Sequence, residues 1–450
     1  MTETATTERR QNPFSRIAKT ALPLYLTMVA SSAGALVDTA LLGRHATSSL
    51  AAFAVTIAVY SPATATVTGA LRGVMPFVSQ HEDDPDGMAP LVRNGMWLGF
   101  IVGLLGAVAV AGVAVIGRAT GVPESTLDHL GAFPYLLAVA VLSTSVGASA
   151  ISVLVALGQG KLVMRAGLVG TAVAVLLSIG LIAGTGPLPA LGLNGAGIAM
   201  LTSSLITTFR VQLALHRLPV LAGQSLRPGR PDLPQVFRLA RVGIPLAGTV
   251  LIKFVVLGVL TFAAARLGTE QAAVHGVSET LVNLIYTLAV AIGQATVPIV
   301  AGSARDADAA GARRSVLAGG GVALCGVGTL GLVLVVFGHW IVPLFSEDAS
   351  LQPQLEDQLP LVFAVVVTDA LQAIAGFGML GLKRTFPSLV STAVFFGLLC
   401  LSAVPVADAG GLTALWSALI CANLLQAITK GVIFYRHSAR LAPEQPGLAT

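Results

Sequence analysis

The chain has 450 residues, of which 55% are hydrophobic and only 10% are charged, and its mean hydropathy is +0.84. Soluble domains carry about 25% charged residues, so this composition excludes a soluble protein and indicates an integral membrane protein with many spans. The net charge of +5 does not indicate a nucleic-acid partner, because the basic residues stand in short loops between apolar runs. The cysteines lie inside apolar runs, so we expect no disulfide, metal site or cofactor.

Twelve apolar runs follow the polar and basic N-terminal segment, and each approaches or exceeds the roughly 20 residues that a membrane span needs. They cover residues 20–42, 49–80, 92–117, 130–157, 163–184, 193–216, 240–265, 270–302, 314–339, 359–382, 386–404 and 412–435. The sequence therefore predicts an all-α polytopic membrane protein with 12 transmembrane helices.

The basic residues predict the orientation of these spans. If the N-terminus is cytoplasmic, 21 of the 26 Lys and Arg residues fall on the cytoplasmic side, among them Lys430 near the end of the last span. Only Arg44, Arg118 and Arg266 fall in outside loops. Cytoplasmic loops carry an excess of Lys and Arg, so we expect a plasma-membrane protein with both termini in the cytoplasm.

An internal repeat divides the chain into two halves. With a shift of 222 residues, ALPL at 21–24 falls on GIPL at 243–246, and Pro76 falls on Pro298. We predict a cytoplasmic tail at 1–19, a first lobe at 20–216, a linker at 217–239, a second lobe at 240–436 and a tail at 437–450. Because each half has an even number of spans, the repeat is parallel, and the two six-helix bundles are related by a pseudo-two-fold axis along the membrane normal.

Three carboxylates lie well inside predicted spans: Asp38, Glu279 and Asp369. A charge at the centre of a span costs about 2.5–3.5 kcal/mol on insertion scales, so such residues usually face a cavity and have a function. We predict that all three couple transport to an ion, with Asp38 as a proton or sodium site. The alternative is a structural role, in which a protonated acid joins two helices through hydrogen bonds.

Other polar side chains accompany these acids. His275, Glu279 and Asn283 recur every four residues, which places them on one helical face suited to relaying protons. Lys253 is expected to pair with Glu279 or Asp369 and to form a latch between helices. The weaker candidates for a substrate cavity are Tyr25, Ser31, Tyr60, Asn194 and Gln372, for which an interfacial or helix-joining role is the alternative.

Three segments carry a resemblance to a known family. VDTALLGRHATSSLAAF at 37–53, GLNGAGIAM at 192–200 and TDALQAIAGFGMLGLKRTFP at 368–387 resemble the multidrug and toxic compound extrusion (MATE) transporters, and the first half is closest to their DinF-like branch. The resemblance covers about residues 16–436. It implies an ion-coupled exporter of small organic compounds, often cationic and amphipathic, that rocks between inward-open and outward-open states.

The sequence departs from this family in the acidic segment HEDDPDG after span two and at two places inside the spans. Members of the DinF-like branch typically carry an Asn and an Asp in span five, where this chain offers only Thr171 and Ser178. Several other members have a Glu in span seven at the position of Lys253. These departures concern the coupling ion rather than the fold.

We therefore predict a secondary antiporter that uses protons or sodium and acts in the lipid bilayer as a monomer. The alternative function is a flippase for a lipid-linked or oligosaccharide substrate. An integral membrane enzyme is disfavoured, because the buried acids are scattered over spans one, eight and ten rather than clustered. The sequence also has no phosphate-binding loop and no Cys/His cluster, so neither an enzyme nor an ATP-driven pump is expected.

Overall fold

The computed structural model describes residues 12–82, 84–184, 189–227, 229–345, 348 and 350–441. Every regular element in these residues is a helix, so the predicted all-α fold is confirmed. A helix is favoured in hydrocarbon because it satisfies its own backbone N–H and C=O groups where no water can do so. The outer parts of the two predicted tails, 1–11 and 442–450, lie outside the described residues.

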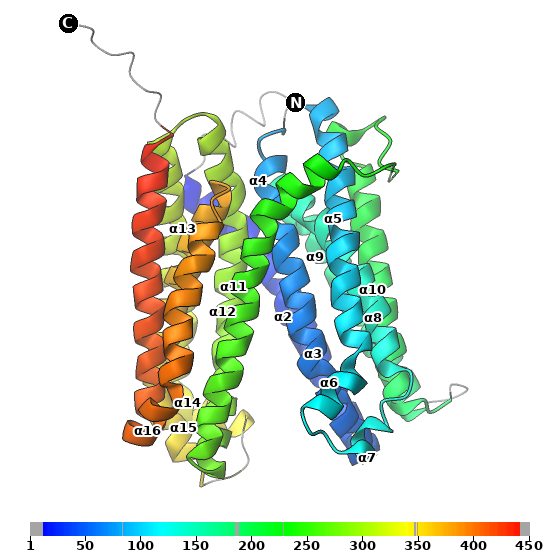
Figure 1. Ribbon diagram of the computed structural model, residues 1–450, viewed down its shortest axis with the longest axis vertical. Coiled ribbons are helices and arrows are strands. Elements are labelled where there is room, and N and C mark those ends of the chain that lie inside the picture. Colours follow the sequence, from blue (N-terminus) through cyan, green and yellow to red (C-terminus); the bar gives the residue numbers. More distant parts are fainter. Residues whose placement is uncertain are drawn as a thin grey trace, which may run out of the picture. The chain divides into compact units, whose positions relative to one another are not determined.

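The helices follow the predicted spans in chain order (Figure 1). The first half contains α2 (Pro13–His45), α3 (Thr47–Leu71), η1 (Arg72–Val74), α4 (Met75–Val78), α5 (Pro85–Ala111), α6 (Val113–Ala119), α7 (Glu124–Leu127), α8 (Phe133–Ala156), α9 (Gly160–Ala183), α10 (Gly192–His216) and η2 (Pro219–Leu221). The second half contains α11 (Leu233–Arg266), α12 (Thr269–Arg305), α13 (Ala309–Val336), α14 (Gly338–Ile341), η3 (Val342–Leu344), α15 (Gln352–Gly381) and α16 (Phe386–Ala439).

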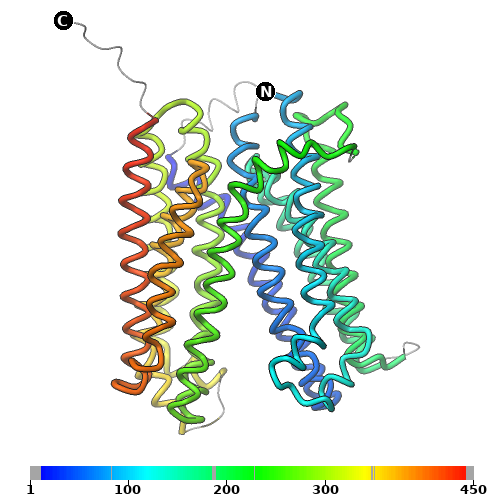
Figure 2. Tube along the Cα trace, in the orientation of Figure 1, coloured from blue at the N-terminus to red at the C-terminus, as the bar shows by residue number. Residues whose placement is uncertain are grey.

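Within the described residues, eleven helices are long and apolar enough to cross a membrane, and α16 accounts for the twelfth crossing. A straight helix of its 54 residues would be about 80 Å long, far more than the roughly 30 Å of a hydrocarbon core. Gly410 and Gly411 interrupt it, and Gly411 has a φ of 65°, which glycine adopts without strain. The Cα trace turns back at this bend, so the two segments run antiparallel (Figure 2).

The chain forms two compact units. Residues 26–250 form the first, called the N unit. In it α5 packs against α8, α10 packs against both α8 and α9, and α3 packs against α5 and α8.

The second unit, called the C unit, combines the start of the chain up to Tyr25 with the residues from Leu251 onward. Here α15 is central and packs against α12, α13 and α16, while α12 also packs against α13. The buried acid Asp369 and its neighbour Gln372 lie on this central helix. The division between the units falls inside α2 and α11, and the predicted lobe boundaries around residues 217–239 stay a prediction.

Two glycines set the distance between α11 and the end of α3 within the N unit. A Cβ atom added to Gly73 would lie 2.6 Å from the Cα atom of Gly243, and one added to Gly243 would overlap the carbonyl oxygen of Ala70. Both neighbours are backbone atoms and cannot rotate away. The backbones can approach this closely only because neither position carries a side chain.

We predict opposite effects for Ala at two glycines of α11. Gly243→Ala overpacks the contact with Ala70 and should lower the melting temperature of the purified protein by several degrees, because overpacking costs about 1–3 kcal/mol. A Cβ atom added to Gly258 would meet no atom outside its own stretch of helix within 4 Å, so Gly258→Ala should leave the melting temperature unchanged or raise it slightly. Equal melting temperatures for the two variants would contradict the close approach.

Candidate functional site

A cavity of about 340 Å³ lies inside the N unit. Its walls come from α2, α3, α8, α9 and α10, and most of its polar groups are hydroxyls. The lining residues are Ser31, Gly34, Ala35, Asp38, Tyr60, Thr64, Thr144, Gly147, Ile151, Thr171, Ala174, Met200, Ser203, Ser204, Thr207 and Thr208. Asp38 is the one carboxylate among them.

Asp38 is buried in this cavity wall, with 5% of its surface exposed. Its Oδ1 atom is buried and has no hydrogen-bond partner. Ser178 of α9 has a buried hydroxyl close to the carboxyl group. An unpartnered buried carboxylate oxygen is costly, so the position suits a group that takes up a proton or a cation.

Span five thus contributes hydroxyls in place of the Asn and Asp that the family resemblance implies. Thr171 lines the same cavity as Asp38, and Gly34 of α2 lies so close to α9 that an added Cβ would be 3.2 Å from the Thr171 methyl group. Carboxylate and hydroxyl oxygens are hard ligands of the kind that sodium prefers, and they also carry protons. The chemistry of these groups therefore fits either ion.

The structure brings together only some of the predicted cavity residues. Ser31 and Tyr60 line the cavity with Asp38. Asn194 lies instead beside Gly131, at the start of α10. Tyr25 belongs to the C unit.

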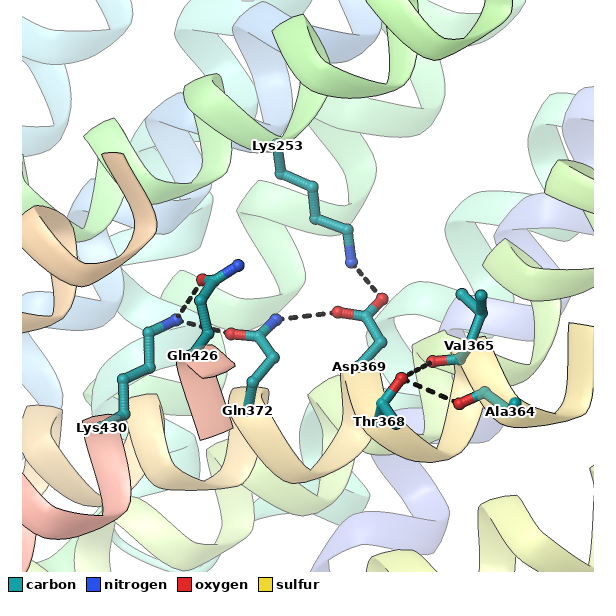
Figure 3. A network of polar contacts seen from close by, with 8 residues as sticks. All are labelled: Lys253, Ala364, Val365, Thr368, Asp369, Gln372, Gln426 and Lys430. Carbon is teal, nitrogen blue, oxygen red and sulfur yellow. Dashed lines mark hydrogen bonds and ion pairs between the residues drawn. The ribbon is translucent and has the colours of Figure 1, made fainter. Parts of the chain in front are cut away.

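A chain of polar contacts crosses the core of the C unit (Figure 3). The ammonium of Lys253 on α11 lies 2.5 Å from Oδ2 of Asp369, and the amide nitrogen of Gln372 donates to Oδ1 of the same carboxylate at 2.8 Å. Lys430 donates to the amide oxygens of Gln372 at 2.6 Å and of Gln426 at 3.0 Å. We call these five residues the C-unit network.

Two features of this network bear on the sequence predictions. Of the two acids predicted as alternative partners for Lys253, the structure places Asp369 in contact with it. The positive-inside pattern counts Lys430 among the basic residues of the cytoplasmic side, but its side chain is only 4% exposed and lies in the network. The sequence feature that indicates this contact is the spacing of four residues between Gln426 and Lys430 within the last span.

A second polar cluster in the C unit contains His275 and Glu279. Trp416 donates its indole N–H to Nδ1 of His275 at 3.2 Å. Since an indole nitrogen can only donate, Nδ1 must be unprotonated and the ring proton must lie on Nε2. This nitrogen faces the hydroxyl of Thr261 at 3.3 Å and the carboxylate of Glu279 at 3.6 Å.

His275 is therefore a neutral donor directed at Thr261 and Glu279, and a proton on Nδ1 would require breaking the bond from Trp416. Asn283, the third residue predicted for this face, is exposed and makes no side-chain hydrogen bond in the described part of the chain. The ion-coupling roles of Asp38, Glu279 and Asp369 and the relay roles of His275 and Asn283 stay predictions.

Comparison with known proteins now identifies the family. The family model MatE matches residues 23–180 and 245–405, which is more than half of the chain. The chain belongs to the MatE family. Members of this family are membrane transporters and not enzymes, so the predicted family and the absence of enzymatic function are confirmed, whereas the DinF-like branch stays a prediction.

The similarity to curated relatives covers nearly the whole length of this MatE chain. A probable multidrug resistance protein NorM of Aromatoleum aromaticum is 28% identical over 440 residues and covers 92% of both chains. A second one, from Burkholderia mallei, is 27% identical over 439 residues and covers 94% of this chain and 93% of its own.

Solved structures share the fold at 17% identity. One is an outward-facing multidrug resistance MATE family transporter of the MOP superfamily, with a TM-score of 0.87 and coverage of 97% of this chain and 98% of its own. Another is a MOP superfamily transporter from Pyrococcus furiosus, with a TM-score of 0.86 and coverage of 96% of this chain and 97% of its own.

A double-mutant cycle tests the pair formed by Lys253 and Asp369. Lys253→Met leaves a buried carboxylate without its ammonium, and breaking such a pair costs about 3–5 kcal/mol. The double variant Lys253→Met/Asp369→Asn should regain part of the lost melting temperature, because neither charge remains. The cycle of Lys253→Met with Glu279→Gln is the control, and stronger coupling in that cycle would contradict the assigned pair.

Nitrogen NMR of labelled histidine tests the tautomer of His275. At neutral pH the spectrum should show a neutral ring with its proton on Nε2, because Trp416 donates to Nδ1. Trp416→Phe removes this donor while keeping an aromatic ring, and the signal should then report a mixture of tautomers. The exposed His339 is the internal control, and its signal should not change.

Proposed function

We propose that this MatE protein is a secondary active antiporter that exports small organic compounds, cationic or amphipathic, in exchange for protons or sodium ions. It alternates between inward-open and outward-open states. The main support for this proposal is the environment of Asp38, a buried acid with an unpartnered oxygen in a cavity lined by hydroxyl groups.

The chemistry of the exchange follows from the charge of Asp38. When ionised, the carboxylate attracts a cation strongly, because the surrounding apolar helices screen charge poorly. A proton or sodium ion bound to the carboxylate neutralises it and removes this attraction. Taking up the ion on one side of the membrane and releasing it on the other therefore drives a cationic compound in the opposite direction.

The substrate class is supported by the relatives and by the size of the cavity. The curated relatives are named multidrug resistance proteins, and 340 Å³ lies within the roughly 300–1,000 Å³ of small-molecule pockets. We also propose that the protein acts in the plasma membrane as a monomer with both termini in the cytoplasm. The basic residues of its loops support the orientation.

A flippase for a lipid-linked or oligosaccharide substrate is less well supported. Such a substrate carries phosphate or many hydroxyls, and an anionic headgroup calls for basic side chains. The cavity of the N unit is lined by one acid and no basic residue.

Gradient-driven efflux from proteoliposomes tests the proposal. Export of a loaded organic cation should start when an inward proton or sodium gradient is imposed, and each gradient is imposed separately. Asp38→Asn should reduce export to the rate of protein-free liposomes, because an amide cannot exchange a proton or bind a cation by charge. Asp128→Asn, which changes an exposed acid of the same unit, is the matched control.

Two results would contradict the proposal. One is export by the unchanged protein that neither gradient accelerates. The other is gradient-driven export that persists in Asp38→Asn at the rate of Asp128→Asn.

A further inference from the structure

The ammonium of Lys253 contacts two groups of the kind that bind organic cations. Oδ2 of Asp369 is 2.5 Å from Nζ, and the centroid of the Tyr286 ring is 3.3 Å from it. A carboxylate and an aromatic face each attract an ammonium group. We call Asp369 and Tyr286 the ammonium receptor, because the ammonium that both of them contact belongs to the protein itself.

The rest of the C-unit network holds this receptor in place. Gln372 donates its amide nitrogen to Asp369 and accepts from Lys430 with its amide oxygen, so its orientation is fixed from both ends. The amide oxygen of Gln426, on the same helix, accepts a second hydrogen bond from Lys430. The carboxylate is only 3% exposed, whereas the side chain of Lys253 is 22% exposed. Lys253 is therefore the more exposed member of the ion pair.

The internal repeat relates this receptor to the cavity of the N unit. Four pairs of landmarks align the halves: Pro23 with Pro245, Pro76 with Pro298, Gly158 with Lys383, and Gly192 with Gly411. Gly158 and Lys383 have positive φ angles of 72° and 57° at the ends of α8 and α15. In both turns the next N–H bonds to the carbonyl oxygen five residues earlier.

Counted from these landmarks, the receptor residues take the positions of residues that line the N-unit cavity. Lys253 matches Ser31, Tyr286 matches Thr64, Asp369 matches Thr144, Gln372 matches Gly147, and Gln426 matches Thr207. Where the N unit has small side chains around a cavity, the C unit has longer ones that meet in a network. Lys253 thus stands where the other half of the repeat leaves space for a ligand.

We propose that Lys253 is a built-in occupant of an organic-cation site, and that a cationic ligand reaches Asp369 and Tyr286 only by displacing its ammonium. This rests on the proposed export of organic cations and adds a second site to it. The displaced ammonium moves toward Glu279, the acid of α12 that contacts α11 through the hydroxyl of Thr261. Lys253 therefore sets the affinity of the site and admits only ligands that outcompete it.

Equilibrium binding of benzyltrimethylammonium to the purified protein in detergent, measured by calorimetry without any ion gradient, tests this proposal. Lys253→Met removes the ammonium from the receptor and should tighten binding about tenfold, because the probe then meets the ring and the carboxylate without a competing ammonium. Lys253→Gln, which keeps a hydrogen bond to Asp369, should tighten it less and decides the question if Lys253→Met does not fold. Lys161→Met, at an exposed lysine of α9, is the control and should not change the affinity.

Two further variants separate this role from a structural one. Adding Asp369→Asn to Lys253→Met should abolish the tighter binding. Glu279→Gln should weaken binding in the unchanged protein, because the displaced ammonium loses its second partner, and should have no effect in Lys253→Met. The proposal is wrong if both Lys253 variants bind the probe no more tightly than the unchanged protein, or if the tighter binding survives Asp369→Asn. Because no gradient is used, a failure of gradient-driven export would not affect this result.

Discussion

The cost of holding a charge inside apolar helices governs the polar interior of this protein. The C unit meets this cost by pairing Asp369 with Lys253 at 2.5 Å, which leaves the pair neutral. The N unit does not, since Asp38 is surrounded by hydroxyls and its Oδ1 atom has no partner. A charge that is paired with an opposite charge inside the protein needs no further counter-ion, whereas an unpartnered carboxylate is stabilised when it binds a proton or a cation. The same constraint thus separates a carboxylate that the protein itself neutralises from one that, on the proposed mechanism, an exchanged ion neutralises.

The cost of polar groups in hydrocarbon also explains why the membrane spans could be predicted from the sequence, whereas the ends of the helices could not. Each helix must satisfy its own backbone groups in hydrocarbon, so apolar runs alone indicated the spans, and the interruption of α16 at Gly410 and Gly411 falls in the predicted gap between the last two. Two helices begin before their apolar runs at a capped end that hydropathy does not indicate. The side chain of Asp84 accepts from the N–H of Gly87 at the start of α5, and the side chain of Asp308 accepts from the N–H of Gly311 at the start of α13.

The candidate site was predictable as far as local spacing could indicate it. Asp369 and Gln372 are three residues apart on one helix, and their contact follows from that spacing. The sequence does not decide whether Lys253 pairs with Glu279 or with Asp369. These two acids lie on different helices, and only the packing of the helices brings one of them into contact with the lysine. Lys430 was missed for the same reason, since its burial depends on Gln372 of a neighbouring helix. The spacing of residues in a sequence indicates which face of its own helix a residue lies on, but not which neighbouring helix that face contacts.

The repeat shows that the two halves differ in their charges more than in their backbones. Leu260 takes the place of Asp38 in the second half and is 1% exposed, so the position is buried in both halves but carries an acid in one. Conversely, Ser31 takes the place of Lys253, and a short hydroxyl there leaves room beside the cavity. In the N unit the buried acid has no lysine beside it, whereas in the C unit the buried lysine is paired with an acid. The same arrangement of helices therefore holds an unpaired acid in one half and a neutral ion pair in the other. The duplicated fold therefore places small side chains around a cavity in the N unit and longer, interacting side chains at the corresponding positions of the C unit, where the proposed occupant is Lys253.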